Sequence, residues 1–253
     1  MDMTIYQSIL FTISYFNIFD YPVTFFEVWK YLYKNNAPLE DVIDALDRLV
    51  EEKKIETKNG FYFIPGRSNL VDQKQKKYAI SEKFWDKAIF ATKVLTFVPF
   101  IKGVCVVNSL AFFNCEKDSD IDFLIITKKG KIWTARALSS TLLQLLGMRR
   151  HGKKVAKRIC LSFYISESKM CLDYLAKDEL GFFVAYWVAQ STPLINKNKV
   201  FEKFRQENNW IKDILPNSDL NYSDYYLKFR KPLFSDFFRS LYNAFIIFCS
   251  FCF

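Results

Sequence analysis

The sequence is poor in the residues and segments that mark several classes of protein. It has one histidine in 253 residues, and only two of its six cysteines, Cys249 and Cys252, have Cys-x-x-Cys spacing. With no second pair and no histidine nearby, a zinc cluster is not expected. Low-complexity tracts and internal repeats are also missing, and a chain with 51% hydrophobic and 25% charged residues is expected to fold.

Signals for export and for membrane crossing are missing as well. The chain begins with an acidic residue, Asp2, where a signal peptide is basic, and no small-residue cleavage site follows. Residues 241–253 are nearly all apolar, but this run is shorter than the roughly 20 residues that span a bilayer. We expect a cytoplasmic protein with free thiols and no transmembrane span, whose apolar end is a docking or interfacial helix or the stump of a longer chain.

Charge is distributed unevenly along the chain. Residues 1–66 hold ten acidic and six basic residues, a net charge of −4, whereas the whole chain carries +9. The remaining residues therefore carry +13. A polyanionic partner, such as a nucleoside triphosphate or a nucleic acid, is expected to meet this second part of the chain.

The first 66 residues predict three helices and a hairpin. Apolar residues are dense from Ile5 to Phe16, Thr24 is a plausible N-cap, and residues 39–50 repeat apolar positions at helical spacing. A hairpin turn is expected at Asn59-Gly60, since both residues tolerate positive φ. This order predicts a winged-helix-like domain.

Such a domain suggests DNA binding through its third helix. In residues 40–54, however, acids outnumber bases by six to three, which is unfavourable next to a phosphate backbone. We therefore favour a role in packing or in docking a partner protein over DNA reading.

The central part of the chain carries the candidate chemistry. A long amphipathic helix is expected from about Asp72 to Leu95, with lysines on its outer side, followed by a buried strand that ends at Asn108-Ser109. A second buried strand, residues 121–127, is entered through Asp120 and Asp122. Side chains two apart on a strand point the same way, so these carboxylates converge on one point, which favours a hard cation such as Mg²⁺.

The segments Val107-Asn108-Ser109-Leu110-Ala111 and Asp118-Ser119-Asp120-Ile121-Asp122 resemble the Gly-Ser and Asp-x-Asp signature of the DNA polymerase beta-like nucleotidyltransferase superfamily. In particular, residues from about 5 to 216 are similar to bacterial and archaeal nucleotidyltransferase-domain proteins with a winged-helix-like segment before the core. The resemblance implies that Asp120 and Asp122 bind Mg²⁺ or Mn²⁺, and that Ser109 with nearby backbone amides holds the terminal phosphates of a nucleoside triphosphate such as ATP. It also implies that an acceptor hydroxyl attacks the α-phosphate and that pyrophosphate leaves.

The sequence departs from that signature at two places. Asn108 stands where the family has glycine, and the third strand, Arg158 to Ile165, lacks the expected third carboxylate. Glu167 or Asp173, which follow that strand, are the candidates to replace it. These departures motivate an alternative, a catalytically weakened core that binds nucleotide or a partner as a regulatory module.

The segment between Asp122 and Glu167 has no acidic residue and ten basic ones. It is either a solvated basic surface or a contact for triphosphate or a nucleic-acid acceptor. Lys128 and Lys129 join Asn108 and Ser109 as nucleotide-binding candidates. The lone His151 is interpreted as a surface residue.

A helix from about Ile132 to Leu146 is expected within this segment. Its predicted buried residues are Trp133, Ala137, Leu138, Thr141, Leu142 and Leu145. Two later helices, one ending near Pro193 and one over 200–214 with Trp210 inward, are expected to cover one side of the sheet.

The expected fold class is α+β. It consists of a winged-helix-like domain (1–66), a polymerase beta-like core with a small mixed sheet and flanking helices (67–215), and an aromatic-rich helical segment (216–253). The expected function is metal-dependent transfer of a nucleoside monophosphate to an acceptor hydroxyl on a protein, an RNA or a small molecule. The alternatives are the regulatory module and a winged-helix nucleic-acid binder.

Overall fold

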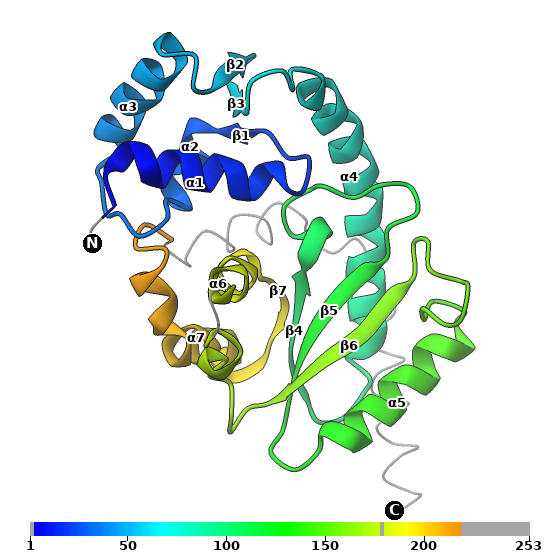
Figure 1. Cartoon of the computed structure of the whole chain (residues 1–253). Coiled ribbons are helices and arrows are strands. Elements are labelled where there is room, and N and C mark those ends of the chain that lie inside the picture. Colours follow the sequence, from blue (N-terminus) through cyan, green and yellow to red (C-terminus); the bar gives the residue numbers. More distant parts are fainter. Residues whose placement is uncertain (1–2, 178–179, 219–253) are drawn as a thin grey trace, which may run out of the picture.

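The computed structural model of the chain describes residues 3–177 and 180–218, and it has a mixed α+β architecture (Figure 1). Its helices are α1 (Ile5–Asn17), α2 (Phe25–Lys30), α3 (Leu39–Glu51), α4 (Asn69–Leu95), α5 (Ile132–Leu145), α6 (Gly181–Gln190) and α7 (Val200–Glu207). Its strands are β1 (Val23–Thr24), β2 (Glu56–Lys58), β3 (Phe61–Phe63), β4 (Ile101–Val107), β5 (Ile121–Thr127), β6 (Ile159–Ser166) and β7 (Thr192–Asn196). Short 3₁₀ turns include η1 (Asn108–Leu110), η2 (Asp173–Leu175), η3 (Lys197–Lys199) and η4 (Asn209–Asp213).

The first part of the chain forms three helices and a small antiparallel sheet in the order β1-β3-β2. Thr24 is the N-cap of α2, which confirms the prediction, and it also forms a capping box with Glu27. The turn between β2 and β3 has positive φ at both Asn59 and Gly60, which confirms the predicted hairpin. The two-residue strand β1 is an addition that the sequence did not predict.

The second part is built on a four-stranded mixed sheet in the order β6-β5-β4-β7. Strand β5 pairs antiparallel with β4 and parallel with β6, and β7 pairs antiparallel with the other side of β4. Both central strands are buried on both faces apart from single half-buried positions, so the continuous apolar runs predicted for them are confirmed.

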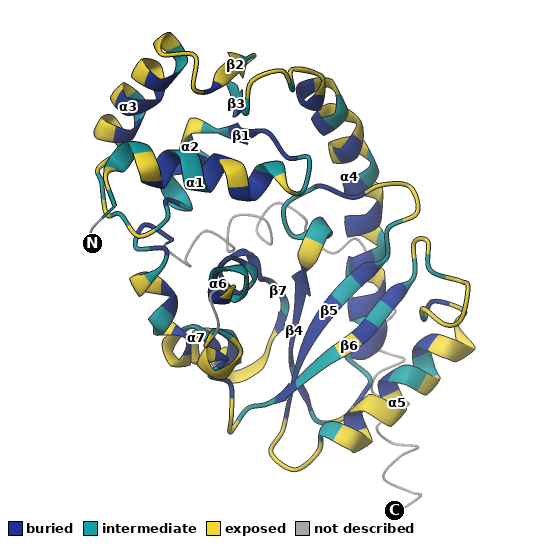
Figure 2. Ribbon diagram, viewed as in Figure 1, coloured by how far each residue is buried: buried dark blue, intermediate teal, exposed yellow. Residues whose placement is uncertain are grey.

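Helices cover both faces of this sheet (Figures 1 and 2). One face packs under α4 and α5, through residues such as Val104, Phe123 and Ile125. The opposite face packs against α6 and α7, and its apolar cluster continues without a break into α1, α2 and α3. The two helices after the third strand therefore cover one side of the sheet, as expected, and they also connect it to the first 66 residues.

Helix α4 differs from expectation in where its lysines lie. Lys74 and Lys77 are 8% exposed, although lysines were predicted on the solvent side. The Lys74 ammonium lies 2.9 Å from the centre of the Tyr21 ring and 3.9 Å from a Glu27 oxygen, so its partners come from the first part of the chain. A helical pattern within one segment cannot reveal partners that another segment supplies.

The predicted buried face of α5 is wrong. Ala135, Ser139 and Leu143 are buried there, whereas most of the predicted residues are exposed. The helix has apolar residues around most of its circumference, and only one side packs on β6 and α4. The residues predicted to be buried but exposed here are Trp133, Ala137, Leu138, Thr141 and Leu145, while Leu142 is half-buried.

Two further differences concern the last described residues. Strand β7 was not predicted, because Pro193 was interpreted only as a helix stop, whereas proline is tolerated in an edge strand such as β7. The predicted helix over 200–214 is divided at Asn208 into α7 and η4, with Trp210 half-buried. The predicted helical segment beyond residue 218 lies outside the described residues. Among the described residues no helix is long and apolar enough to cross a membrane.

Candidate functional site

The two carboxylates of the Asp-x-Asp motif lie at the start of β5. Asp122 pairs with Val107, the last residue of β4, so the entry of β5 lies beside the point where β4 turns into η1. Asp122 shares the strand face of Leu124 and Ile126, which point toward α6 and α7. Ligand atoms of Asp120 and Asp122 lie within 4.8 Å of each other. The predicted convergence of the two carboxylates is therefore present.

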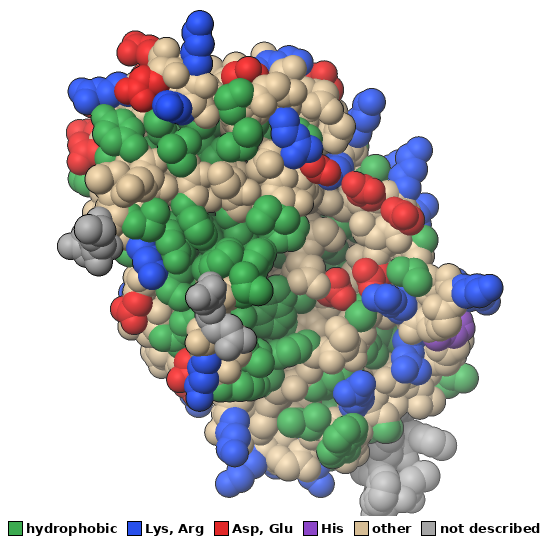
Figure 3. All heavy atoms as spheres, viewed as in Figure 1, with side chains coloured by type: hydrophobic (Ala, Val, Ile, Leu, Met, Phe, Trp, Pro, Cys, Tyr) green, Lys and Arg blue, Asp and Glu red, His purple; other side chains and the backbone are tan. Residues whose placement is uncertain are grey.

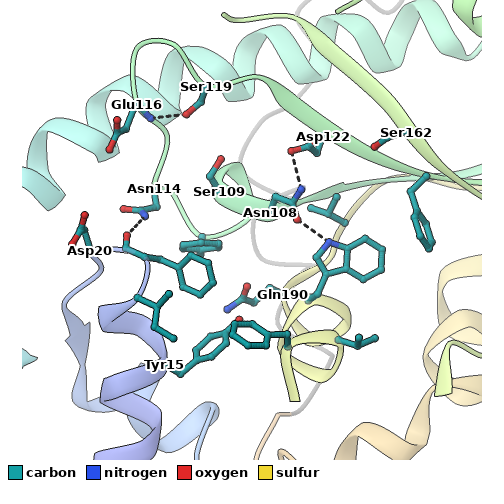
Figure 4. A pocket seen from close by; sticks show the side chains of 18 of the residues that line it. Tyr15, Asp20, Asn108, Ser109, Asn114, Glu116, Ser119, Asp122, Ser162 and Gln190 are labelled. Atoms are coloured by element: carbon teal, nitrogen blue, oxygen red, sulfur yellow. Dashed lines mark hydrogen bonds between the residues drawn. The ribbon is translucent and has the colours of Figure 1, made fainter. Parts of the chain in front are cut away.

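Asn108 is held at the turn after β4 by its backbone and by two side-chain hydrogen bonds. Its φ of 57° is in the left-handed region, which glycine adopts easily and asparagine tolerates. Its side-chain Nδ2 donates to Asp122 Oδ2 at 2.8 Å, and its Oδ1 accepts from Trp187 Nε1 at 2.8 Å (Figure 4). Asn108 thus adopts a conformation that glycine adopts easily, and its side chain connects Asp122 to α6.

Ser109 lies next to Asn108 in η1, and both residues line a cavity (Figure 4). Its hydroxyl is 3.6 Å from the sulfur of Cys115, and its carbonyl accepts from the backbone N–H of Asn114. These contacts fix the loop between β4 and β5. The structure therefore brings together four of the six predicted site residues.

Arg150 binds the other carboxylate. Its Nη1 donates to Asp120 Oδ2 at 2.6 Å, and the Asp120 side chain is 17% exposed. Arg150 belongs to the basic loop that follows α5, and sequence reasoning did not single it out. Each carboxylate of the pair therefore accepts a hydrogen bond from its own chain, Asp120 from Arg150 and Asp122 from Asn108.

The position next to Asp122 on the third strand is occupied by a thiol. Cys160 pairs with Asp122 in the parallel β5–β6 register, and its sulfur lies within 4.8 Å of ligand oxygens of both aspartates. The candidates Glu167 and Asp173 are not part of this group. Glu167 follows the far end of β6, where its side chain accepts from the backbone N–H of Lys129. The prediction that Glu167 supplies the third carboxylate is therefore wrong.

Burial and mutual repulsion act on the acidic groups of the site. Burial raises the pKa of Asp122, and the negative charge of Asp120 adds to that rise, while the hydrogen bond from Asn108 opposes it. Burial also raises the pKa of the Cys160 thiol. A nearby positive charge would therefore stabilise the ionised form of Asp122, which lines the cavity.

A cavity of about 770 Å³ opens beside these residues, between the end of α1, the β4–β5 loop and α6. Asn108, Ser109 and Asp122 form part of its polar wall (Figure 4). The opposite wall is aromatic and apolar, and Figure 3 shows hydrophobic side chains gathered over the middle of this face. Its aromatic residues are Tyr15, Phe19, Phe112, Phe163, Phe183 and Trp187. Sequence reasoning missed them because they come from four separate segments.

Lys128 and Lys129 are not brought to this site. They follow the C-terminal end of β5, six and seven residues beyond Asp122, which is roughly 20 Å along an extended strand. Two other cations lie at the site: Lys77 lines the cavity and pairs with Glu116 at 3.4 Å, and Arg150 pairs with Asp120. His151 is exposed, in agreement with its interpretation as a surface residue.

The site therefore combines a carboxylate pair, a hydroxyl at a tight strand-to-turn junction, and a cavity large enough for a nucleotide. Comparisons of the chain with protein-family models, with curated proteins and with solved structures find no match.

Proposed function

We propose that this chain is a metal-dependent nucleotidyltransferase that transfers a nucleoside monophosphate from a nucleoside triphosphate, such as ATP, to an acceptor hydroxyl. The observation that carries the proposal is the convergence of Asp120 with Asp122, which lines the 770 Å³ cavity together with Ser109. In this proposal the mixed sheet is a polymerase beta-like core, and the first 66 residues are a winged-helix-like domain.

The donor set at β5 fits a divalent cation. Two carboxylates at an accessible strand end supply the hard oxygen ligands that Mg²⁺ and Mn²⁺ accept, and the remaining positions are left for water and phosphate oxygens. The thiol of Cys160 is a softer ligand, which suits Mn²⁺ better than Mg²⁺. A cation held by Asp120 and Asp122 supplies charge neutralisation of the phosphates.

The remaining chemistry is positioning by the chain itself. The aromatic wall provides flat surfaces for stacking a base, and the turn at Asn108-Ser109 lies where phosphates would meet backbone N–H groups. The acceptor oxygen forms a bond to the α-phosphorus, the bond from that phosphorus to the bridging oxygen breaks, and pyrophosphate leaves. The hydroxyl proton is lost to solvent. We propose that the reaction takes place in the cytoplasm, where nucleoside triphosphates are supplied.

The experiment is incubation of the purified protein with each α-labelled triphosphate, with Mg²⁺ or Mn²⁺, and with protein, RNA and small-molecule fractions of a lysate as acceptors. We expect label in one acceptor fraction, and its loss in Asp120→Asn/Asp122→Asn. Asp118→Asn is the matched control, because Asp118 is an exposed aspartate of the same loop outside the ligand group. Equal transfer by the double variant, or no nucleotide binding with either cation, contradicts the proposal.

A second candidate is a regulatory module that binds nucleotide without turnover. It is favoured by the bonds that Arg150 and Asn108 make to the two carboxylates and by the thiol in place of a third carboxylate. Nucleotide binding that depends on the aspartates, without any labelled product, distinguishes it. The nucleic-acid-binding alternative has weaker support, because α3 holds five acidic residues and one basic residue, and the upper left of Figure 3, where α3 lies, shows acidic side chains among the basic ones.

A further inference from the structure

Helix α5 presents an apolar face to solvent. Trp133 is 77% exposed and Leu145 is 80% exposed, and Leu138 and Leu146 are 42% and 51% exposed. At 100° per residue, Trp133, Ala137, Thr141, Leu138 and Leu145 fall on the side opposite Ala135, Ser139 and Leu143, which pack on the sheet. The exposed apolar residues therefore lie in one stripe along α5, which also contains the exposed, uncharged polar residues Thr134, Thr141 and Gln144.

The stripe contains no charge. Residues 132–145 hold no acid and one base, Arg136, which lies at the edge of the stripe with its guanidinium carbon 5.8 Å from the centre of the Trp133 ring. A solvent-facing helix side of this length is ordinarily covered with charged residues. The outer face of α5 is thus uncharged, and three large apolar side chains, Trp133, Leu138 and Leu145, are exposed on it.

Cations flank the stripe at both ends. Exposed Lys128, Lys129 and Lys131 precede α5, and exposed Lys153 and Lys154 follow it. No acidic residue interrupts the sequence from Asp122 to Glu167, so the segment has no carboxylate of its own to neutralise these charges. Figure 3 shows several basic side chains at the lower right, where Figure 1 places α5.

We infer that α5 and its basic flanks form a docking surface for an anionic lipid bilayer. A helix that lies in the membrane interface buries an apolar face to the depth of the headgroup boundary, while Lys and Arg beside it contact anionic headgroups. Trp133 is suited to that boundary, where tryptophan is enriched. This surface is independent of the proposed reaction.

Other occupants fit the charges less well. A second copy of the chain docked through α5 sets its basic flanks against identical basic flanks, which repel. Residues 219–253 carry three acids and four bases, so they do not offer the negative charge that the flanks need. A nucleic acid satisfies the cations but leaves Leu138, Leu145 and Leu146 without an apolar partner.

Docking through α5 leaves the candidate site accessible. Helix α5 covers the sheet face that α4 covers, whereas Asp122 and the cavity lie on the face of α6 and α1. A bilayer against α5 therefore leaves the cavity open on the opposite face of the sheet.

The test is co-sedimentation of the full chain with vesicles of phosphatidylcholine alone and of phosphatidylcholine with 30% phosphatidylserine, together with tryptophan emission. We expect binding to the anionic vesicles, a shift of the emission to shorter wavelength, and weakening of binding by salt. Trp133→Ser/Leu145→Ser is expected to reduce partitioning at least about tenfold. Lys153→Gln/Lys154→Gln is expected to reduce it roughly 30-fold, at about fivefold for each lysine.

Two controls are matched to these variants. Phe90→Ser removes a 47% exposed aromatic residue from α4, and Lys53→Gln/Lys54→Gln removes two exposed lysines after α3, so neither should change partitioning. Equal binding to neutral vesicles, binding that the α5 variants do not reduce, or a dimer that the α5 variants dissociate would overturn the inference. Preferential binding of RNA that survives Trp133→Ser/Leu145→Ser would also overturn it.

Discussion

Cys160 lies opposite Asp122 across the parallel pairing of β5 and β6, with its sulfur within 4.8 Å of a carboxylate oxygen. This register places a thiol at the position where a third strand carboxylate would complete the acidic group. If the site binds a cation as proposed, Cys160 is therefore the side chain expected to influence which cation it prefers.

Replacing this thiol with a carboxylate should change cation preference. Cys160→Asp supplies a third hard oxygen ligand, so we expect Mg²⁺ affinity to rise roughly tenfold relative to Mn²⁺. Calorimetric titration of the nucleotide-free protein with each cation measures the change. Cys160→Ser is the control, since it removes the sulfur without adding charge, and an equal gain for Cys160→Ser would contradict the prediction.

Removing Arg150, which is hydrogen-bonded to Asp120, should make the Asp120 carboxylate more available to a cation. Arg150 Nη1 is 2.6 Å from Asp120 Oδ2, so a cation competes with the guanidinium for the same oxygen. In Arg150→Ala we expect cation affinity to rise about tenfold. Arg149→Ala is the control, because it removes an equal charge from the same loop and should leave cation affinity unchanged. The same titration measures both, and unchanged affinity in Arg150→Ala would show that the ion pair does not compete.

The conformation of Asn108 predicts an order of stabilities. At a φ of 57°, alanine is disfavoured relative to glycine by about 1 kcal/mol, and both variants lose the two side-chain hydrogen bonds. Asn108→Gly should therefore be more stable to urea than Asn108→Ala. At Ser109, whose φ is negative, the order should reverse, with Ser109→Ala more stable than Ser109→Gly. The same order at both positions would contradict the argument.

Much of the site and its supporting strands followed from local sequence. The continuous apolar runs of β4 and β5 are enough by themselves to predict buried strands. Asp120 and Asp122 converge because side chains two residues apart on a strand point the same way. The Asn59-Gly60 turn is similarly local.

The remaining features depend on contacts between distant segments. Cys160 becomes a neighbour of Asp122 only through the β5–β6 register, and Arg150 reaches Asp120 only because the loop after α5 returns to the start of β5. Strand β7 is a short edge strand that forms by pairing with β4, and its residue pattern alone does not predict a strand. Helix α5 has apolar residues on two sides, so its sequence alone does not decide which side is buried.

The buried, charged carboxylate of Asp122 should lower the free energy of unfolding at neutral pH. Burial raises the pKa of Asp122 above its unfolded value, so the folded protein binds a proton more readily than the unfolded chain. The free energy of unfolding then falls as pH rises through the window between the two pKa values. Without added cation, Asp122→Asn should raise the melting temperature at pH 7, and the gain should vanish below the ordinary aspartate pKa of 3.8. A lower melting temperature for the variant at pH 7 would contradict this.

Lys74 connects α4 to the first part of the chain and should make stability depend on alkaline pH. Its burial lowers its pKa from 10.5 to about 8, although Glu27 opposes the shift. Between these values the unfolded chain binds more protons than the folded protein, so the free energy of unfolding should rise with pH. Lys74→Met should abolish this rise between pH 8 and 9.5, while Lys76→Met, at an exposed position of α4, should retain it. Urea unfolding across this range measures both slopes. If Lys74→Met keeps the wild-type slope, Lys74 does not lose its proton on folding, and its contacts with Tyr21 and Glu27 hold it charged.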